Sequence, residues 1–313
     1  MTIRIVRAGV QATLQGRPRR GARWLAAPAA GPADPLSMAL ANRLVGNCPD
    51  ATAVEITLGG FEARIEADIA IGLTGAEGVA SLDGEPVAFH QTLHARAGSA
   101  LSIDPPRHGM RTYLAIASGL AAQEAFGSPS TYSPARWGGH QGRALLPGDV
   151  LRVQGASTMP PAIETPARHR PAIGPAFALR ACASAETALL APGSKAALFE
   201  QSFVVSARID RMGARLKGAR LDLASDGRMA SGAVYPGVIQ CPEDGAPIVL
   251  LCDAQTTGGY PRIASVARAD RHLLGQLRPG ARVRLLNRTR DEAINDLREK
   301  SAYLVEWLPE FRM

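Results

Sequence analysis

The chain of 313 residues is 46% hydrophobic and 20% charged, a composition typical of an ordinary globular protein. No apolar run approaches the roughly 20 residues that cross a bilayer, and the N-terminus lacks a basic region followed by an apolar stretch, so we expect neither a membrane span nor a secretory signal. The formal net charge is +7, but its densest basic cluster, Arg17 to Arg23, has no interleaved aromatic platform. We therefore expect a cytoplasmic protein that binds neither nucleic acid nor membrane, and whose charge suits an anionic small molecule or an acidic protein partner.

Short strands and turns dominate the predicted elements, because the chain has 32 glycines and 23 prolines but only 5% aromatic residues. Strands are predicted at Ile3–Arg7, Ala53–Leu58, Phe61–Ile65, Ile69–Leu73, Thr112–Ala117, Val150–Val153, Val204–Ala207 and Ile248–Cys252. Tight turns that join strands are predicted at Asp83-Gly84, Asp226-Gly227 and Asp244-Gly245.

The clearest predicted helix extends from Asp34 to about Val45. Asp34 suits the N-cap, Pro35 suits the first helical position, and Gly46 suits the end of the helix. The leucines of this segment recur on one face, which is typical of a helix that packs against a core.

Two further helices are predicted in the C-terminal half. One covers Arg268–Leu277, with the leucines at 273, 274 and 277 facing inward. The other starts at Thr289, where Thr289 and Glu292 have the spacing of a capping box. Ile294 and Leu297 are the expected buried side of this last helix.

A short pattern recurs along the chain: a glycine, two residues, then an alternating apolar pair. It occurs at Gly98–Ile103, Gly148–Val153 and Gly280–Leu285, and each copy predicts a turn before a half-buried strand. The stretch 154–176 is rich in proline and has no periodicity, which is typical of a linker. We therefore predict an N-terminal domain over residues 1–155, a Pro-rich connection over 156–176, and a C-terminal domain over 177–313 that ends in a helix.

The common catalytic signatures are missing from this sequence. It contains no phosphate-binding P-loop, no nucleophile elbow, no zinc-protease helix and no dinucleotide-binding glycine motif. The four cysteines lack metal-ligand spacing, which predicts no zinc site and no disulfide framework and agrees with a reducing compartment. His90 and His94 are four residues apart without a third ligand nearby in sequence, so we interpret them as a surface pair and predict no metal site.

Three polar, glycine-rich segments are candidate binding loops: Gly127–Thr131, Gly138–Arg143 and Gln255–Tyr260. Successive glycine amides in the second segment could form an anion-binding nest, and Arg143 could pair with a carboxylate or a phosphate. The third segment follows a buried strand and offers an amide and two hydroxyls beside a Gly-Gly pair, which lets a ligand approach the backbone. The alternative in each case is a loop or tight turn whose polar groups form hydrogen bonds with its own backbone.

Arg111 and Tyr113 fall on the same face of a predicted apolar strand, because side chains alternate along a strand. Arg111 is a candidate anion contact, and its alternative is a salt bridge at a strand edge. The alternative for Tyr113 and for Tyr260 is a half-buried ring whose hydroxyl meets water. The residues alone leave both interpretations open.

Several motifs occur in the order in which KipA-type proteins carry them, and the chain resembles this family over nearly its whole length. The matching segments are Asp34-Pro-Leu, Ala41-Asn-Arg-Leu-Val-Gly-Asn47, Glu55-Ile-Thr, Gly127-Ser-Pro-Ser-Thr, Gly138-Gly-His-Gln-Gly-Arg-Ala-Leu, Gln240-Cys-Pro-Glu-Asp-Gly-Ala-Pro-Ile and Gln255-Thr-Thr-Gly-Gly-Tyr-Pro. Such proteins are also described as the C subunit of 5-oxoprolinase or as allophanate hydrolase subunit 2-like proteins, within the biotin-dependent carboxyltransferase family. Several ordered motifs are far more specific than one glycine-rich loop.

The resemblance implies a mainly β fold of two cyclophilin-like β-barrel domains with a few helices. It also implies a heteromer with a KipI-like protein, the B subunit. With a LamB/YcsF-like protein, the A subunit, such a complex acts as an ATP-dependent hydrolase, a 5-oxoprolinase that converts 5-oxo-L-proline to L-glutamate with ATP and Mg²⁺. The alternatives are a biotin-dependent carboxyltransferase, as in urea amidolyase, and a non-catalytic regulatory partner of KipI.

On this resemblance, catalytic roles are assigned to Gln255, Thr257 and Arg262. Contacts to substrate or ATP are assigned to Arg111, Tyr113, Ser130, Thr131, Gly138, Gly139, Gly142, Arg143, Gln240, Thr256, Gly258, Gly259 and Tyr260. Some positions depart from the family pattern: Gln15-Gly-Arg17 lacks an Asp, Pro129 stands where Arg is frequent, and Arg262 stands where Lys is common. Arginine keeps the charge but cannot transfer a proton near neutral pH, so this chain could be a divergent paralogue.

Overall fold

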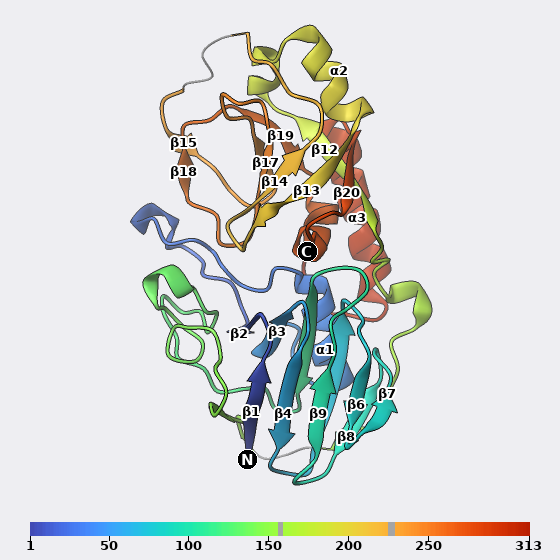
Figure 1. The fold of residues 1–313 in the computed structure, drawn as a ribbon. Helices are drawn as coiled ribbons and strands as arrows, with labels where there is room; N and C mark the ends of the chain where they lie inside the picture. Colours follow the sequence, from blue (N-terminus) through green and yellow to red (C-terminus); the bar gives the residue numbers. More distant parts are fainter. Residues whose placement is uncertain (156–158, 225–228) are drawn as a thin grey trace. The chain divides into compact units, whose positions relative to one another are not determined.

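The computed structural model describes residues 1–155, 159–224 and 229–313, and the predicted turn at Asp226-Gly227 lies outside this range. The chain divides into two compact units, with unit 1 mainly in blue to green and unit 2 mainly in yellow to red (Figure 1). Unit 1 consists of residues 1–20, 30–173 and 304–312, and unit 2 consists of residues 21–29, 174–303 and 313. Each unit therefore includes a short segment from the other end of the chain.

The strands of unit 1 form two antiparallel sheets. The six-stranded sheet has the order β11-β1-β4-β9-β6-β7, made of Thr2–Ala8 (β1), Phe61–Ile65 (β4), Ala80–Leu82 (β6), Glu85–Val87 (β7), Ala100–Ile103 (β9) and Val150–Arg152 (β11). The five-stranded sheet has the order β2-β3-β10-β5-β8, made of Gln11–Gln15 (β2), Ala53–Thr57 (β3), Ile69–Gly75 (β5), Thr92–Ala95 (β8) and Arg111–Ile116 (β10). The predicted Asp83-Gly84 turn joins β6 to β7.

Helix α1, Pro35–Leu44, begins and ends where the sequence predicts it. The Asp34 carboxylate accepts a hydrogen bond from the Ser37 amide at 3.0 Å, which satisfies one of the free donors of the first turn. The helix packs on β3, β5 and β10, all of which are buried along their whole length. Gly72 in β5 allows close approach, since a Cβ there would lie 2.7 Å from the Ala41 carbonyl oxygen.

The core of unit 1 draws apolar side chains from both sheets and from α1. Ile3 and Ile5 of β1 and Phe61 of β4 enter it from the six-stranded sheet, and each is at most 1% exposed. Because the two sheets and the helix share this one cluster, the apolar runs that predict β3, β5 and β10 are explained by burial on both faces.

Seven strands of unit 2 close into a barrel with the order β12-β19-β16-β17-β14-β13-β20. They are Ala176–Ala183 (β12), Ser202–Ile209 (β13), Gly213–Lys217 (β14), Val238–Gln240 (β16), Ile248–Leu250 (β17), Arg262–Val266 (β19) and Arg282–Asn287 (β20). Strand β20 is parallel to β12 and antiparallel to β13. A separate two-stranded sheet pairs Gly232–Ala233 (β15) with Thr257–Gly258 (β18). The predicted mainly β fold is confirmed.

The helices of unit 2 differ in part from the prediction. Helix α2, Pro192–Glu200, was not predicted, and the segment predicted as an α-helix from Arg268 is a 3-10 helix, Arg268–Gln276 (η5). Helix α3, Arg290–Val305, follows the predicted capping box. The remaining 3-10 turns are Arg23–Leu25 (η1), Ser133–Ala135 (η2), Ala167–His169 (η3) and Ala185–Leu189 (η4).

The capping box of α3 is confirmed, but its predicted buried side is not. Thr289 Oγ1 accepts from the Glu292 amide at 3.2 Å, and the Glu292 carboxylate accepts from the Thr289 amide at 2.7 Å. Ile294 is exposed and Leu297 is half-buried, whereas Leu304 is buried. The apolar periodicity of this helix was too weak to identify its buried face.

The recurring glycine pattern marks real turns. Gly98, Gly148 and Gly280 have φ values of +93°, +92° and +87°, where glycine is favoured, and β9, β11 and β20 each begin two residues later. The predicted Asp244-Gly245 turn likewise lies between the paired strands β16 and β17. Among the helices of the described ranges, none is long and apolar enough to cross a membrane.

Candidate functional site

The Gly127–Thr131 segment of unit 1 is fastened to the chain around β2 by its own hydroxyls. Ser130 Oγ donates to the Gly16 carbonyl and accepts from the Gly16 amide, both at 3.0 Å. Thr131 Oγ1 donates to the Leu14 carbonyl at 2.9 Å. Both side chains are buried, so their hydroxyls satisfy backbone groups of the same unit. This arrangement does not support the predicted ligand contacts of Ser130 and Thr131.

The three glycines of the second segment allow tight backbone packing. Gly138, Gly139 and Gly142 have φ values of +65°, +61° and +65°. A Cβ would lie 2.3 Å from a backbone oxygen at Gly138, 1.9 Å from Thr131 Oγ1 at Gly139, and 2.1 Å from the Arg136 oxygen at Gly142. These contacts match the alternative interpretation, a loop that satisfies its own backbone, rather than an anion-binding nest.

The guanidinium of Arg143 is engaged inside the same loop region. Its Nη1 and Nη2 atoms donate to the two Asp149 oxygens at 2.7 and 2.9 Å, a bidentate pair. Nη2 also donates to Gln141 Oε1 at 3.0 Å. The hydrogen bond from Arg143 lowers the pKa of Asp149 to about 2. Because an internal carboxylate already occupies the fork, the predicted contact of Arg143 with an external anion is not supported here.

Arg111 and Tyr113 share a face of β10, as predicted, but that face is buried. Tyr113 is 0% exposed, and its hydroxyl donates to Glu55 at 2.8 Å and accepts from the Asp34 amide at 2.7 Å. Arg111 Nε lies 3.3 Å from the same Glu55 carboxylate. Burial, followed by the Glu55 charge, raises the pKa of Tyr113. This buried cluster links β3, β10 and the start of α1, which agrees with the alternative of internal partners for Arg111 and Tyr113; their contact with substrate or ATP stays a prediction.

The third segment, in unit 2, is anchored at its start by a buried ion pair. Asp253 accepts from Arg211 Nε at 2.8 Å and from Nη2 at 3.0 Å. The segment then lies against residues 229–234: the Val234 amide donates to the Thr256 carbonyl, and β18 pairs with β15. Thr256 is buried, whereas Gln255 is exposed, so the anchor fixes the backbone and leaves one amide side chain toward solvent.

The Gly-Gly pair of this segment makes room for protein groups. A Cβ at Gly258 would lie 2.9 Å from Gln240 Nε2, and one at Gly259 would lie 3.0 Å from the Met229 carbonyl oxygen. These glycines let the Gln240 side chain and a neighbouring backbone approach, which agrees with the alternative of a tight turn; their contact with a ligand stays a prediction.

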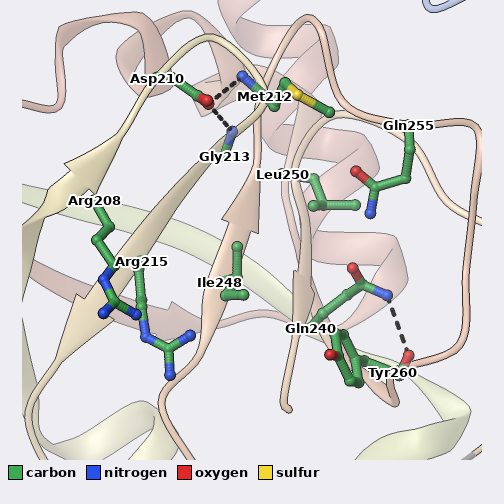
Figure 2. A pocket seen from close by; sticks show the side chains of 10 residues that line it. All are labelled: Arg208, Asp210, Met212, Gly213, Arg215, Gln240, Ile248, Leu250, Gln255 and Tyr260. Atoms are coloured by element: carbon green, nitrogen blue, oxygen red, sulfur yellow. Dashed lines mark hydrogen bonds between the residues drawn. The ribbon is translucent and has the colours of Figure 1, made fainter.

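A pocket of about 290 Å³ lies beside this segment, and Figure 2 shows the side chains that line it. Gln240, Gln255 and Tyr260, all predicted from the sequence, are among them. Gln240 is only 1% exposed, and its Nε2 donates to the Tyr260 carbonyl at 3.2 Å, which leaves its oxygen without a donor among the described residues. Within the ranges that the structure describes, neither the Gln255 carboxamide nor the Tyr260 hydroxyl has a hydrogen-bond partner.

The floor of the pocket is the outer face of the barrel. Gly213 pairs with Leu250 and Arg215 pairs with Ile248, so these four residues share one face of β14 and β17, while Ala214 and Val249 point into the barrel core. The absence of a side chain at Gly213 leaves the floor open above the aliphatic groups of β17.

Charged residues line the rim of the pocket. They are Arg208, Asp210 and Arg215, from β13, its turn and β14. Arg215 forms an ion pair with Asp244, and Asp210 caps the turn by accepting from the Met212 and Gly213 amides at 2.7 and 3.0 Å. No sequence signal identifies these residues, because charged residues on the outer face of a strand resemble a solvated surface.

Arg262 follows the segment and holds the structure around it. Its Nη1 donates to the Ala233 carbonyl at 3.0 Å, and its Nη2 pairs with Glu186. The hydrogen bond with Glu186 raises the pKa of Arg262, so this guanidinium stays charged at any physiological pH. Arg262 thus connects η4, β15 and β19 beside the predicted catalytic segment.

The described residues contain no group of three His, Cys, Asp or Glu side chains that could hold a metal ion. The predicted surface pair of histidines is half right: His94 is exposed and lies 3.3 Å from the Pro160 carbonyl, but His90 is buried. Burial lowers the pKa of His90 to about 4, so it is neutral near pH 7.

A mainly β protein with a closed barrel and a small polar pocket on the barrel's outer face is the class that these features define. The chain belongs to the family described as carboxyltransferase domain, subdomain A and B, whose model matches residues 25–287. This confirms the family predicted from the ordered motifs.

Two bacterial proteins and one solved structure support the same family. The chain is 36% identical to the C subunit of 5-oxoprolinase from Escherichia coli over 96% of both chains. It is 33% identical to the C subunit of the Haemophilus influenzae 5-oxoprolinase, covering 94% of both chains. The solved structure of Kluyveromyces lactis urea amidolyase matches 98% of this chain and 20% of its own, with a TM-score of 0.90 and 26% identity.

Proposed function

We propose that this protein is the C subunit of an ATP-dependent 5-oxoprolinase, which cleaves 5-oxo-L-proline to L-glutamate. The observation that carries the proposal is the 36% identity to the corresponding E. coli 5-oxoprolinase protein over 96% of each chain. Because a protein of that name is one part of an assembly, partner proteins are needed, and we propose a KipI-like partner and a LamB/YcsF-like partner. The four free cysteines agree with a cytoplasmic location.

The pocket of unit 2 supplies the polar groups for a small cyclic amide. Gln255 and Gln240 offer amide donors and acceptors, and Tyr260 offers a hydroxyl at the rim. Thr257 is exposed in β18 and is not among the residues that line the pocket. We propose that its hydroxyl contacts the substrate from this neighbouring strand, and that Thr256, Gly258 and Gly259 hold the strand in place. Arg262 then acts as a fixed charge that positions the segment, and not as a proton carrier.

Two of the arginines predicted to contact substrate or ATP are engaged by carboxylates of this chain. The guanidinium of Arg143 is engaged by Asp149, and that of Arg111 lies buried beside Glu55. ATP supplies the free energy that activates a resonance-stabilised lactam, and Mg²⁺ accompanies it. We therefore assign no phosphate contact and no Mg²⁺ ligand to this chain, and propose that it contributes the lactam site.

The test is glutamate release from 5-oxo-L-proline and ATP by the complete complex, with each component omitted in turn. We expect glutamate and phosphate to form together, and both to disappear when this chain is left out. Glutamate formation that continues at full rate without this chain would refute the proposal. Thr257→Ala should abolish or strongly reduce turnover while leaving the unfolding transition unchanged.

A second candidate is carboxyl transfer from carboxybiotin, which the family description and the match to urea amidolyase favour. No Met-Lys biotin-carrier segment is present among these 313 residues, so under this candidate the carboxybiotin comes from outside them. Its test is transfer of radiolabelled carboxylate from a carboxylated biotin carrier to urea.

A third candidate, a non-catalytic partner of a KipI-like protein, rests on Pro129 and Arg262. Pro129 is packed closely against Gly16, where a Cβ would lie 2.8 Å from its ring. A stable complex that shows neither activity would favour this candidate, and Pro129 and Arg262 would then be the first positions to revert to the family residues.

A further inference from the structure

The pocket of unit 2 has an exposed cation at its rim. Arg208 lines the pocket, and its backbone amide donates to Ser206 Oγ at 3.1 Å. Among the described residues, its guanidinium has no carboxylate or carbonyl partner. By contrast, Arg215 is paired with Asp244, and Asp210 is held by two backbone amides.

The local strand geometry brings this cation to the pocket. Val205 pairs with Leu216, and Ile209 pairs with Ala214. Between these two pairs, β13 has the three residues 206–208, whereas β14 has only Arg215. This bulge breaks the regular alternation of β13. As a result, Arg208 and Arg215 lie on the same side and both line the pocket, as Figure 2 shows.

The other side of the pocket is complementary to an amide. Figure 2 shows Gln255, Gln240 and Tyr260 there, with Ile248 and Leu250 between them and the arginines. A primary carboxamide presents a donor and an acceptor side by side, and a lactam presents the same pair on its ring edge, so the two can form two hydrogen bonds. The aliphatic side chains give the ring methylenes an apolar surface.

We propose that Arg208 binds the carboxylate of a lactam acid whose amide edge is read by Gln255, so that Arg208 selects 5-oxo-L-proline over lactams without a carboxylate. This rests on the proposed function. A guanidinium fork matches the two oxygens of a carboxylate. The charged residues that line the pocket, Arg208, Arg215 and Asp210, have a formal charge of +1, and Arg215 is already paired with Asp244. The pocket therefore lacks the positive excess that a triphosphate needs, and a volume of about 290 Å³ suits a small ligand.

The first experiment measures binding to the full chain by isothermal titration calorimetry, with 5-oxo-L-proline, 5-oxo-L-prolinamide and inorganic phosphate as probes. The variants are Arg208→Gln, which removes the charge, Arg208→Lys, which keeps it, and Arg284→Gln as the matched control. Arg284 is an exposed arginine on β20 that does not line the pocket. We expect Arg208→Gln to weaken binding of 5-oxo-L-proline by about 10- to 100-fold, Arg208→Lys to weaken it less, and Arg284→Gln to leave it unchanged.

The neutral prolinamide should bind the wild-type chain and Arg208→Gln equally. Unchanged affinity of Arg208→Gln for 5-oxo-L-proline would overturn the proposal, as would tighter binding of phosphate than of 5-oxo-L-proline, or no binding of the lactam acid to the wild-type chain. All variants should keep the wild-type unfolding midpoint, because the Arg208 side chain has no partner among the described residues.

The second experiment separates this inference from the proposed function. In the complete complex, Arg208→Gln should raise the KM for 5-oxo-L-proline and leave the KM for ATP unchanged. Wild-type turnover with an unaffected KM in Arg208→Gln would overturn the Arg208 assignment alone. Binding of 5-oxo-L-proline that depends on Arg208, in a complex that releases no glutamate, would overturn the 5-oxoprolinase function alone.

Discussion

The glycine-rich loop of unit 1, residues 127–143, and the glycine-rich segment of unit 2, residues 253–262, use the same residue types in different ways. In unit 1 the hydroxyls of Ser130 and Thr131 hold backbone carbonyls, and Arg143 holds Asp149. In unit 2 the backbone is anchored by a separate ion pair, and Gln255 and Tyr260 are left without side-chain partners in the described ranges. A polar, glycine-rich sequence is therefore not evidence for a binding site until its own partners have been counted.

The largest expected effect is a loss of stability when Gly142, in the loop of unit 1, is replaced. Gly142→Ala should lower the free energy of unfolding by about 1–2 kcal/mol from its left-handed backbone alone, with a further loss from the clash at 2.1 Å with Arg136. Gly127→Ala is the matched control, because its φ is also left-handed, at +68°, but no atom lies within 4 Å of a Cβ there. Urea unfolding of both variants measures the difference, and equal losses would contradict the close packing described for Gly142.

The next largest loss of stability is expected when the buried hydroxyl of Tyr113 is removed. Tyr113→Phe leaves the Asp34 amide without its acceptor and Glu55 without one donor, so we expect a loss of about 1–3 kcal/mol. Activity per folded molecule should not change, because this cluster does not line the pocket of unit 2. Turnover of the complex at a temperature where the variant is folded checks this, and a raised KM at full stability would restore the predicted ligand role of Tyr113.

Arg143→Ala should destabilise the chain by about 1 kcal/mol and change its acid sensitivity. The pKa of Asp149 is lowered to about 2 in the folded state from an ordinary value near 3.8, so the folded state holds fewer protons between these values. The stability from this pair is complete above pH 3.8 and is lost as the pH falls toward 2. Unfolding measured between pH 5 and pH 2 should therefore show a shallower loss in Arg143→Ala; an identical slope in both proteins would contradict the pairing.

The smallest effect is expected for Gln255→Ala in unit 2. It removes one uncharged amide from a pocket, so we expect KM for the lactam to rise by about 2- to 10-fold, which corresponds to about 0.5–1.5 kcal/mol. The free energy of unfolding should stay unchanged, because this side chain has no partner in the described ranges. Loss of stability with unchanged KM would show that Gln255 bonds to the protein itself, as the polar side chains of the unit 1 loop do. The two segments would then no longer differ in this respect.

Much of the fold was predictable because its signals are local. Helix α1 carries its cap, its proline and its terminal glycine within one short stretch, and the three turn glycines at 98, 148 and 280 each precede a strand. Strand β14 was missed because only two of its residues, Ala214 and Leu216, face the core, and so short an alternation does not stand out in the sequence. The exchange of residues 21–29 and 304–312 between the units carries no local signal at all.

The site was harder to predict because its outcome depends on distant partners. Tyr113 resembled a ligand contact until Glu55, 58 residues earlier, was found to accept its hydrogen bond. Gly258 resembled a ligand approach, but Gln240 occupies that space. Arg208 reaches the pocket through a bulge whose register no sequence pattern showed. Residue type could be read from the sequence, whereas the identity of each partner required the structure.

The closure of the barrel by β20 has a consequence for the order of events during synthesis. Strand β20 lies between β12 and β13, so a nascent chain that has not yet produced residues 282–287 leaves both of those strands with an unpaired edge. Unpaired edges are sites of aggregation, and closure across so many intervening residues is slow. The nascent chain is therefore most prone to aggregate when a ribosome stalls shortly before β20. Chaperones that bind exposed strand edges are most needed at that point in translation.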